Sequence, residues 1–339
     1  RDAAELVAAG RSPYDRKTYR YSPVFAWALV PDVWLGTRNV GKVLFSLCDV
    51  ALGLALESVV KGRRASSAGA FWLFWNPVAL NICTRGSSDA VVAALVAGAL
   101  VFVEKEALCG VLLGLAAHVK IYPLLHVPAF FMSVRRKRVF ACAAGVTFAA
   151  LTGWAHRAFP EQYVEHALSY HAFRADHRHN FSPFWLPLFL DCTFPPALLA
   201  HVVVQASALA YLAPTDLVRC VFAQTILFVA FNKVATAQYF LWWLPFAVVL
   251  VFSSSEEEGA EESSSPPAEG KRRRRRTAGV LRAAALWLTT LAAWLAVAYA
   301  LEFQGYPVHV ALWGLSLGFF AANILVFVAI LRLDAAESS

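Results

Sequence analysis

The chain has little charge for its length. Only 16% of its 339 residues are Asp, Glu, Lys or Arg, and 59% are apolar, whereas about a quarter of the residues in a soluble globular protein are charged. A mean hydropathy of +0.54 points the same way. Long uncharged runs recur between residues 40 and 331, and several reach the ~20 residues needed to cross ~30 Å of hydrocarbon. The composition therefore excludes an ordinary soluble domain and predicts an all-α polytopic membrane protein.

Several patterns that would indicate other classes are missing. The six cysteines form no CxxC pair and no metal-type spacing, so we expect most of them to be small core residues. No internal repeat is visible, which argues against a transporter built from repeated halves. The net charge of +7 lies in short clusters between apolar runs, which is typical of topology signals and not of nucleic-acid binding. No signal-peptide pattern is present and the first residue is Arg1, so we expect a piece of a longer protein.

Three short basic clusters, at 61–64, 135–138 and 271–276, set the predicted topology. Short basic loops stay in the cytoplasm, and four apolar spans between successive clusters return the chain to the same side each time. Together with the apolar run at 40–60, this reading predicts about 11 transmembrane helices; the other ten are at about 67–83, 89–104, 107–119, 122–134, 138–155, 195–213, 216–231, 237–252, 279–301 and 308–331. The spans 107–119 and 122–134 are short, and a broken, tilted or re-entrant pair there would leave the parity unchanged.

The same pattern predicts four regions. Residues 1–38 are expected to be the remainder of a first loop on the non-cytoplasmic side, with an interfacial or half-spanning helix interrupted by Pro31. Residues 39–252 are expected to be the transmembrane core. Residues 253–277 are acidic, then basic, and of low complexity, which predicts a disordered cytoplasmic loop. Residues 278–339 are expected to hold the last transmembrane helices and a cytoplasmic tail.

The richest polar loop on the non-cytoplasmic side reads HALSYHAFRADHRHNFSP. His177, His179 and the adjacent Asp176 have ligand types that bind metals, but Arg174 and Arg178 would repel a cation. The guanidinium fork of arginine suits phosphate oxygens, so the loop favours anion binding, with a solvated loop touching lipid headgroups as the alternative. Its Asn-Phe-Ser sequon is followed by proline in a loop close to the membrane, which argues against its glycosylation.

Other loops on the same side repeat the pattern at lower density. Arg85 precedes Gly86, which lets the backbone approach a ligand, and Lys120 and Lys233 lie near the ends of apolar runs. Each of these cations could simply snorkel to the interface, but four cationic loops on one side suggest a cradle for an anionic lipid head. Acids are scarce there. An inverting sugar transfer with a phosphate leaving group needs one carboxylate as base and cations for the developing charge, and that matches this composition.

Seven stretches, in order along nearly the whole chain, resemble the GPI mannosyltransferase I family. They are 10–23 (GRSPYDRKTYRYSP), 41–50 (GKVLFSLCDV), 74–89 (FWNPVALNICTRGSSD), 118–123 (HVKIYP), 174–184 (RADHRHNFSPF), 228–243 (FVAFNKVATAQYFLWW) and 301–305 (LEFQG). The resemblance implies a GT-C glycosyltransferase architecture in the endoplasmic reticulum membrane, with a lumenal active site. It implies inverting α1,4 transfer of the first mannose from dolichyl phosphate mannose to glucosaminyl-phosphatidylinositol, a small single-span partner subunit, no nucleic-acid partner, and no cofactor or metal.

The resemblance also implies roles for particular residues. The expected donor-phosphate contacts are Arg85, Lys120, Arg174, His177, Arg178, His179 and Lys233. The expected acceptor-side residues of the first loop are Tyr14, Arg16, Tyr19, Arg20 and Tyr21, of which Arg20 and Tyr21 have interfacial anchoring as the alternative. Asp2 and Asp89 are expected to order the catalytic site.

The chain departs from the family in one respect. The family's main acidic D-x-D-type motif lies just upstream of the segment that aligns with Asp2, so the motif and the first transmembrane helix are absent from this sequence. We therefore expect the fragment as such to be inactive. The alternatives to the enzyme are an inactive fragment or non-catalytic subunit and, less favoured, a lipid or solute transporter.

The topology gives a first prediction. A Ser66→Cys variant should react with a membrane-impermeant thiol reagent from the cytoplasm, whereas Ser87→Cys should react only after the lumen is permeabilised, because the two positions lie at opposite ends of one span. The unsubstituted chain, with its six native cysteines, gives the background labelling. The reverse pattern would contradict the sidedness of every loop assigned above.

Overall fold

The computed structural model describes residues 1–60, 65–170, 174, 176, 178–192, 196–261 and 267–333. Within these ranges every regular element is helical and none is a strand, which confirms the predicted all-α class. The chain divides into two compact units, the first with residues from 1–59 and 65–174, the second with Val60 and residues from 176 onward. Each unit is described by itself.

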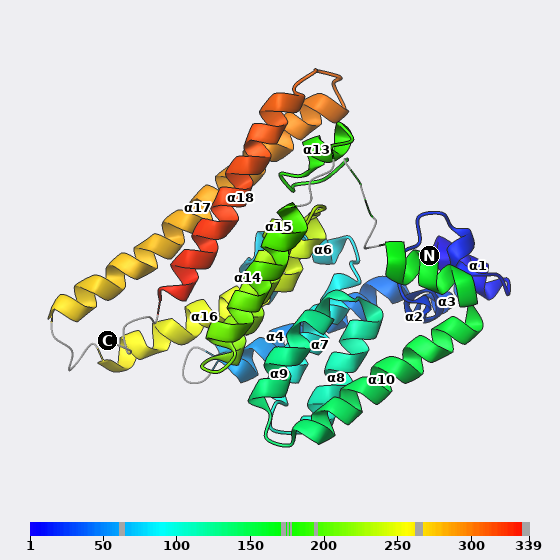
Figure 1. Ribbon diagram of the computed structural model, residues 1–339, viewed down its shortest axis with the longest axis horizontal. Helices are drawn as coiled ribbons and strands as arrows, with labels where there is room; N and C mark the ends of the chain where they lie inside the picture. Colours follow the sequence, from blue (N-terminus) through cyan, green and yellow to red (C-terminus); the bar gives the residue numbers. More distant parts are fainter. Residues whose placement is uncertain are drawn as a thin grey trace. The chain divides into compact units, whose positions relative to one another are not determined.

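The first unit combines short helices near its amino terminus with longer apolar ones. Its α-helices are α1 (Asp2–Ala8), α2 (Pro23–Ala28), α3 (Val30–Trp34), α4 (Asn39–Val59), α5 (Ala65–Ala70), α6 (Pro77–Thr84), α7 (Asp89–Val101), α8 (Glu106–Val119), α9 (Val127–Ser133), α10 (Lys137–Ala158) and α11 (Pro160–Tyr163). Its 3-10 and π turns are η1 (Pro13–Asp15), η2 (Phe71–Trp75), η3 (Tyr122–His126) and η4 (Val164–Ser169). Helix α8 packs against both α7 and α10, and α4 packs against α7 (Figure 1).

Two glycines let α8 and α10 approach closely. A Cβ added at Gly110 would lie 2.6 Å from the carbonyl oxygen of Phe140, and one at Gly114 would lie 2.5 Å from that of Ala144. Both contacts are with backbone atoms, which cannot rotate away as a side chain can. Small residues at such spacing are the usual way in which membrane helices reach close backbone contact.

Prolines shorten several of the predicted spans. Pro77 begins α6 after Asn76, whose side chain caps that helix, so the predicted span 67–83 is divided into α5, η2 and α6. The predicted span 122–134 is a 3-10 turn followed by the seven-residue α9, with Pro123 and Pro128 at the starts of the two pieces. At 1.5 Å per residue, a seven-residue helix is far too short to cross a bilayer alone.

Five helices of the described chain are long and apolar enough to cross a membrane. They lie at Asn39–Val59, Lys137–Ala158, Ala237–Ser254, Arg274–Glu302 and His309–Leu331. Four shorter apolar helices accompany them, at Asp89–Val101, Glu106–Val119, Ala200–Leu212 and Leu217–Phe231. A polytopic membrane protein is therefore consistent with the structure, whereas the predicted number of about 11 spans is not confirmed.

The second unit is built mainly from longer helices, which are α14 (Pro196–Leu212), α15 (Leu217–Phe231), α16 (Phe240–Glu261), α17 (Pro267–Glu302) and α18 (His309–Leu331). Two short elements accompany them, α13 (Trp185–Phe189) and the 3-10 turn η5 (Ala237–Tyr239). Helices α17 and α18 run side by side as a hairpin (Figure 1), and α15 contacts α14, α16 and α18. Ser316 of α18 accepts hydrogen bonds from the indoles of Trp185 (3.0 Å) and Trp294 (2.8 Å), so apolar helices are joined by bonds that lipid cannot supply.

The helices on both sides of the acidic and basic segment continue into it. Helix α16 extends to Glu261 and α17 begins at Pro267, whereas residues 262–266 lie outside the described part of the chain. The disorder predicted for 253–277 stays a prediction, as do the boundaries of the four predicted regions.

The close contact of α8 and α10 gives a second prediction. Gly114→Ala places a methyl group against a backbone carbonyl, so the two helices must separate, at an overpacking cost of about 1–3 kcal/mol. The midpoint of thermal unfolding of the detergent-solubilised protein should fall. Gly145→Ala in α10 is the matched control, because nothing lies within 4 Å of a Cβ at that position, and equal midpoints for the two variants would contradict the packing.

Candidate functional site

A buried ion pair joins two of the predicted site loops in the first unit. The ammonium group of Lys120 contacts the carboxylate of Asp89, and the two side chains are 11% and 3% exposed. Asp89 is the first residue of α7, where the helix dipole stabilises a carboxylate, and the hydroxyl of Ser87 donates to its other oxygen at 2.9 Å. Gly86, with a φ of +74°, forms the turn that precedes them.

An aromatic residue of the first loop lies beside this pair. The ammonium nitrogen of Lys120 is 5.3 Å from the ring centroid of Tyr21, a cation–π distance. The structure therefore brings together a predicted donor-phosphate residue, a predicted acceptor-side residue and one of the two predicted site acids. Arg85 ends α6 four residues before Asp89, and its side chain is exposed.

His118, at the end of α8, fastens the first loop to this cluster. Its Nε2 is hydrogen-bonded to the hydroxyl of Ser22 at 2.8 Å, and its Nδ1 to the hydroxyl of Thr152 on α10 at 3.2 Å. Ser22 directly follows Tyr21, and His118 lies two residues before Lys120. The imidazole therefore bonds to the residue next to Tyr21 and lies on the same segment as Lys120. This arrangement positions both partners of the cation–π contact.

The first loop is folded around its own tyrosines. The hydroxyl of Tyr14 donates to the carbonyl oxygen of Tyr21 at 3.0 Å, and that of Tyr19 donates to the carbonyl oxygen of Ser22 at 2.6 Å and accepts from the amide of Ala26 at 3.2 Å. Burial raises the pKa of both phenols above its usual range. They stay neutral hydrogen-bond donors at physiological pH and fix the path of the loop.

Two aromatic residues outside the predicted set hold Arg20. Its guanidinium donates to Nδ1 of His166 at 2.6 Å, and its Cζ lies 4.2 Å from the ring centroid of Tyr170. The hydroxyl of Ser12 donates to the side chain of Gln162. The loop from 12 to 22 is thus attached to residues 162–170 at both of its ends.

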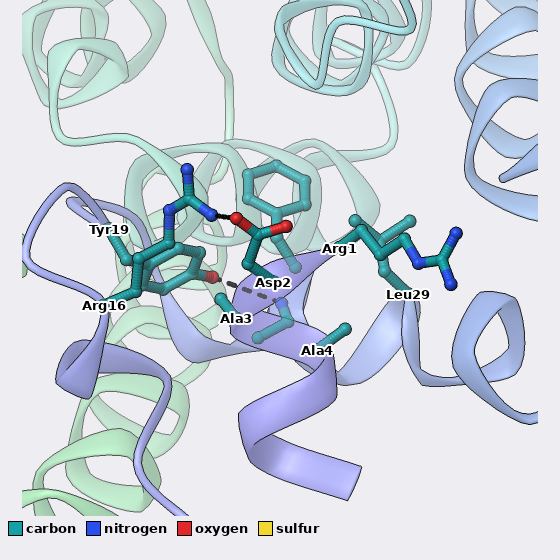
Figure 2. Close-up of a pocket in the computed structure, with 9 residues that line it drawn as sticks. Arg1, Asp2, Ala3, Ala4, Arg16, Tyr19 and Leu29 are labelled. Carbon is teal, nitrogen blue, oxygen red and sulfur yellow. Dashed lines mark hydrogen bonds and ion pairs between the residues drawn. The ribbon is translucent and has the colours of Figure 1, made fainter.

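Asp2 lines a pocket of about 210 Å³ near the amino terminus, and neither Lys120 nor Asp89 is among the residues that line it. Its carboxylate forms an exposed ion pair with Arg16, and Figure 2 shows both beside Tyr19. The pocket is lined by Arg1, Asp2, Ala3, Ala4, Arg16, Tyr19, Phe25, Ala26 and Leu29. Asp2 and Asp89 therefore each have a cationic partner, Arg16 and Lys120 respectively.

In the second unit, the turn that contains Arg178 and His179 is anchored to the end of α17 and to the loop of Lys233. His179 has a left-handed backbone conformation with a φ of +52°. Its Nδ1 lies 2.9 Å from the carboxylate of Glu302. The next residue, Asn180, is buried and is hydrogen-bonded to the backbone of Lys233.

The remaining predicted cations differ in environment. Arg178 and His179 are exposed, Arg174 is half-buried at the end of the first unit, and Lys233 is half-buried, so that burial lowers the pKa of its ammonium group. His177 lies outside the described residues, so the metal reading of this turn is not tested. Among the residues that are described, no three His, Cys, Asp or Glu side chains are grouped closely enough to hold a metal ion.

Sequence reasoning missed the residues that hold the predicted ones in place. These are Ser22, His118, Thr152, His166, Tyr170, Asn180 and Glu302. Several of them belong to loops that the sequence assigned to the same side of the membrane. That shared side was the only sequence signal that these residues could meet. Their pairing could not be read from the chain because the partners are separated by up to 146 residues.

Comparisons with known proteins give matches that cover nearly the whole chain. The family model described as "Mannosyltransferase (PIG-M)" matches residues 82–331. GPI mannosyltransferase 1 of Saccharomyces cerevisiae is 33% identical over 361 residues, which cover 96% of this chain and 83% of the yeast protein. The GPI alpha-1,4-mannosyltransferase I catalytic subunit of Danio rerio is 32% identical over 365 residues, covering 98% of this chain and 86% of the fish protein. The GPI mannosyltransferase 1 of Trypanosoma brucei brucei is 32% identical with similar coverage.

The buried pair gives a third prediction. Lys120→Met leaves the carboxylate of Asp89 buried without its cation, which should destabilise the solubilised protein by about 3–5 kcal/mol. The double variant Lys120→Met with Asp89→Asn should recover part of that loss, because no uncompensated charge remains. Both effects are measured as unfolding midpoints.

The exposed pair of Arg11 and Asp15 provides the control. Arg11→Gln should change the stability by only about 0–1 kcal/mol, as is usual for ion pairs in water. A double variant that is less stable than Lys120→Met alone would contradict the assigned pairing.

Proposed function

The chain belongs to the mannosyltransferase (PIG-M) family, and we propose that it transfers the first mannose, in α1,4 linkage, to the glycosylphosphatidylinositol precursor. The observation that carries this proposal is the match over almost the entire chain to proteins whose names state that activity. The comparisons do not favour the non-catalytic or transporter alternatives.

The proposed substrates are dolichyl phosphate mannose as donor and glucosaminyl-phosphatidylinositol as acceptor. In the transfer, the bond from the anomeric carbon of mannose to the phosphate oxygen breaks, and its electron pair leaves with the dolichyl phosphate. A new bond forms from the same carbon to the acceptor hydroxyl, on the opposite face, which inverts the configuration. The hydroxyl proton passes to a carboxylate base. No oxidant or reductant is consumed, and a lipid phosphate leaves as a stable anion without requiring a metal or other cofactor.

Cationic side chains suit the charge that develops on the leaving phosphate. We assign donor-phosphate contacts to Arg85, Lys120, Arg174, His177, Arg178, His179 and Lys233, as the resemblance implies. The contact of Lys120 with Asp89 and with Tyr21 supports a fixed ammonium group in this set. Because Asp89 already interacts with Lys120, it suits a role in ordering the site rather than in accepting the proton.

The first loop is assigned to the acceptor. Tyr14 and Tyr19 hold its path through hydrogen bonds within the loop. Arg20 is held between His166 and Tyr170, and Arg16 interacts with Asp2. An arginine that is already oriented loses less entropy when it binds the inositol phosphate of the acceptor.

The proposed setting is the endoplasmic reticulum membrane, with about 11 spans in a GT-C architecture, the site loops in the lumen and a small single-span partner subunit beside the catalytic chain. The apolar helices of the described chain support a membrane location, and the names of the relatives support GPI biosynthesis. A direct test uses membranes that contain the complete protein and measures transfer of labelled mannose from dolichyl phosphate mannose to glucosaminyl-phosphatidylinositol. Absence of a mannosylated product would overturn the proposal.

The donor assignment gives a fourth prediction. Arg178→Ala in the complete protein should abolish rescue of cells that lack the first GPI mannose transfer, because the exposed guanidinium is assigned to the leaving phosphate. Surface GPI-anchored protein, measured by flow cytometry, is the readout. Arg38→Ala, which removes an exposed arginine outside the assigned set, should rescue fully. Full rescue by Arg178→Ala would remove that residue from the site.

A further inference from the structure

Asn180 is a polar residue buried at the centre of a loop cluster in the second unit. It is 1% exposed. Its amide nitrogen donates to the carbonyl oxygens of Asp176 at 2.9 Å and Lys233 at 3.0 Å. Its side-chain oxygen accepts from the amides of Ser182 and Ala235, both at 2.9 Å. An asparagine side chain has two donor hydrogens and two acceptor lone pairs, so all four positions are used.

Ser182 repeats the connection two residues later. Its hydroxyl donates to the carbonyl oxygen of Asn232 at 2.6 Å and accepts from the amide of Phe184 at 3.2 Å. The amide of Phe181 donates to the carbonyl oxygen of Ala235 at 2.8 Å. Residues 180–182 are therefore joined to residues 232–235 by four hydrogen bonds: those of Asn180 to Lys233 and Ala235, of Ser182 to Asn232, and of Phe181 to Ala235. The bond between Asn180 and Ser182 closes the turn itself.

These two loops carry three of the cations assigned to the donor phosphate. Arg178 and His179 directly precede Asn180, and Lys233 is the residue whose carbonyl oxygen Asn180 binds. The carboxylate of Glu302, the last residue of α17, contacts His179. The positions of these three cations within the unit thus depend on the neutral side-chain amide of Asn180.

The same residues, Asn180-Phe181-Ser182, form a glycosylation sequon. Attachment of a glycan would replace one of the two amide hydrogens of Asn180 and would require space around a nitrogen that is buried between two carbonyl oxygens. Glycosylation and the observed packing exclude each other. The presence of the Asn-Phe-Ser sequence at this position therefore needs an explanation other than glycosylation.

We propose that Asn180 is a positioning residue that joins the turn of Arg178 and His179 to the loop of Lys233, so that the three cations meet the donor phosphate as one preformed group. This inference rests on the proposed function, because it assigns the purpose of the junction to that donor. Ser182 supports the junction through its bond to Asn232. The serine and the asparagine of the sequon thus both bind the loop at 232–235.

The fifth prediction tests the junction by kinetics in membranes that contain the complete protein. Asn180→Asp keeps the shape of the side chain but sets an oxygen against the carbonyl oxygens of Asp176 and Lys233, so the two loops should separate. The KM for dolichyl phosphate mannose should rise by about tenfold, which corresponds to a loss of about 1.4 kcal/mol in donor binding, while the KM for the acceptor stays unchanged. Asn39→Asp, at an exposed position that begins α4, is the matched control.

The Ser182 variants serve if Asn180→Asp does not accumulate in membranes. Ser182→Thr keeps both the hydroxyl and the sequon and should keep the donor KM, whereas Ser182→Ala removes both and should raise it. Gly145→Ala in the other unit, where nothing lies within 4 Å of the added methyl group, should change neither KM. A donor KM that is unchanged in Asn180→Asp, or in Ser182→Ala where the first variant is not produced, overturns the inference.

A glycan on the wild-type protein is an independent way to overturn it. Treatment with an amidase that removes N-linked glycans should leave the electrophoretic mobility of a fragment containing Asn180 unchanged. A shift that is lost in Asn180→Asp would show that the side chain is a glycan acceptor. Failure of the proposed function is distinct from either result, because then the wild-type membranes themselves would yield no mannosylated product.

Discussion

The contact between Lys120 and Asp89 is the interaction on which the first unit depends. Both groups are charged and nearly excluded from solvent, so each would be costly to bury alone, and each is stabilised only by the other and by its immediate neighbours. The start of α7 favours the carboxylate through its dipole, and the ring of Tyr21 faces the ammonium group. Since Tyr21 belongs to the first loop, the pair joins that loop to the ends of two apolar helices, α7 and α8.

Neutral groups then hold the loops around the charged ones. His118 bonds to Ser22 beside Tyr21, and Asn180 bonds to the backbone beside His179 and Lys233. Backbone groups at the ends of apolar helices have few partners in lipid, so side-chain amides, imidazoles and hydroxyls near the interface satisfy them. Cations that are already oriented before a ligand arrives lower the entropic cost of binding an anion.

The sequence was sufficient for the all-helical class of the fold, but not for the connections between its loops. Apolar runs predicted the long helices α4, α10, α17 and α18, because length and hydropathy are local properties. The same reasoning predicted a span at 122–134, where the structure has a 3-10 turn and a short helix that begin near prolines. Lys120 and Asp89 were both assigned to the site, yet their pairing depends on the packing of α7 against α8, which no local pattern encodes.

The turn at His179 shows why such a connection is needed. A residue other than glycine in the left-handed region costs about 1–3 kcal/mol and persists only where its surroundings determine it. Here the surroundings are Glu302, whose carboxylate contacts the imidazole, and the next residue, Asn180, whose side chain forms four hydrogen bonds. The left-handed backbone lies between Arg178 and Asn180, so the exposed guanidinium and the buried amide belong to one turn. A relaxed backbone at His179 would move the guanidinium of Arg178 away from the buried amide of Asn180. The hydrogen bonds of Asn180 therefore stabilise the strained backbone that keeps the two residues in one turn.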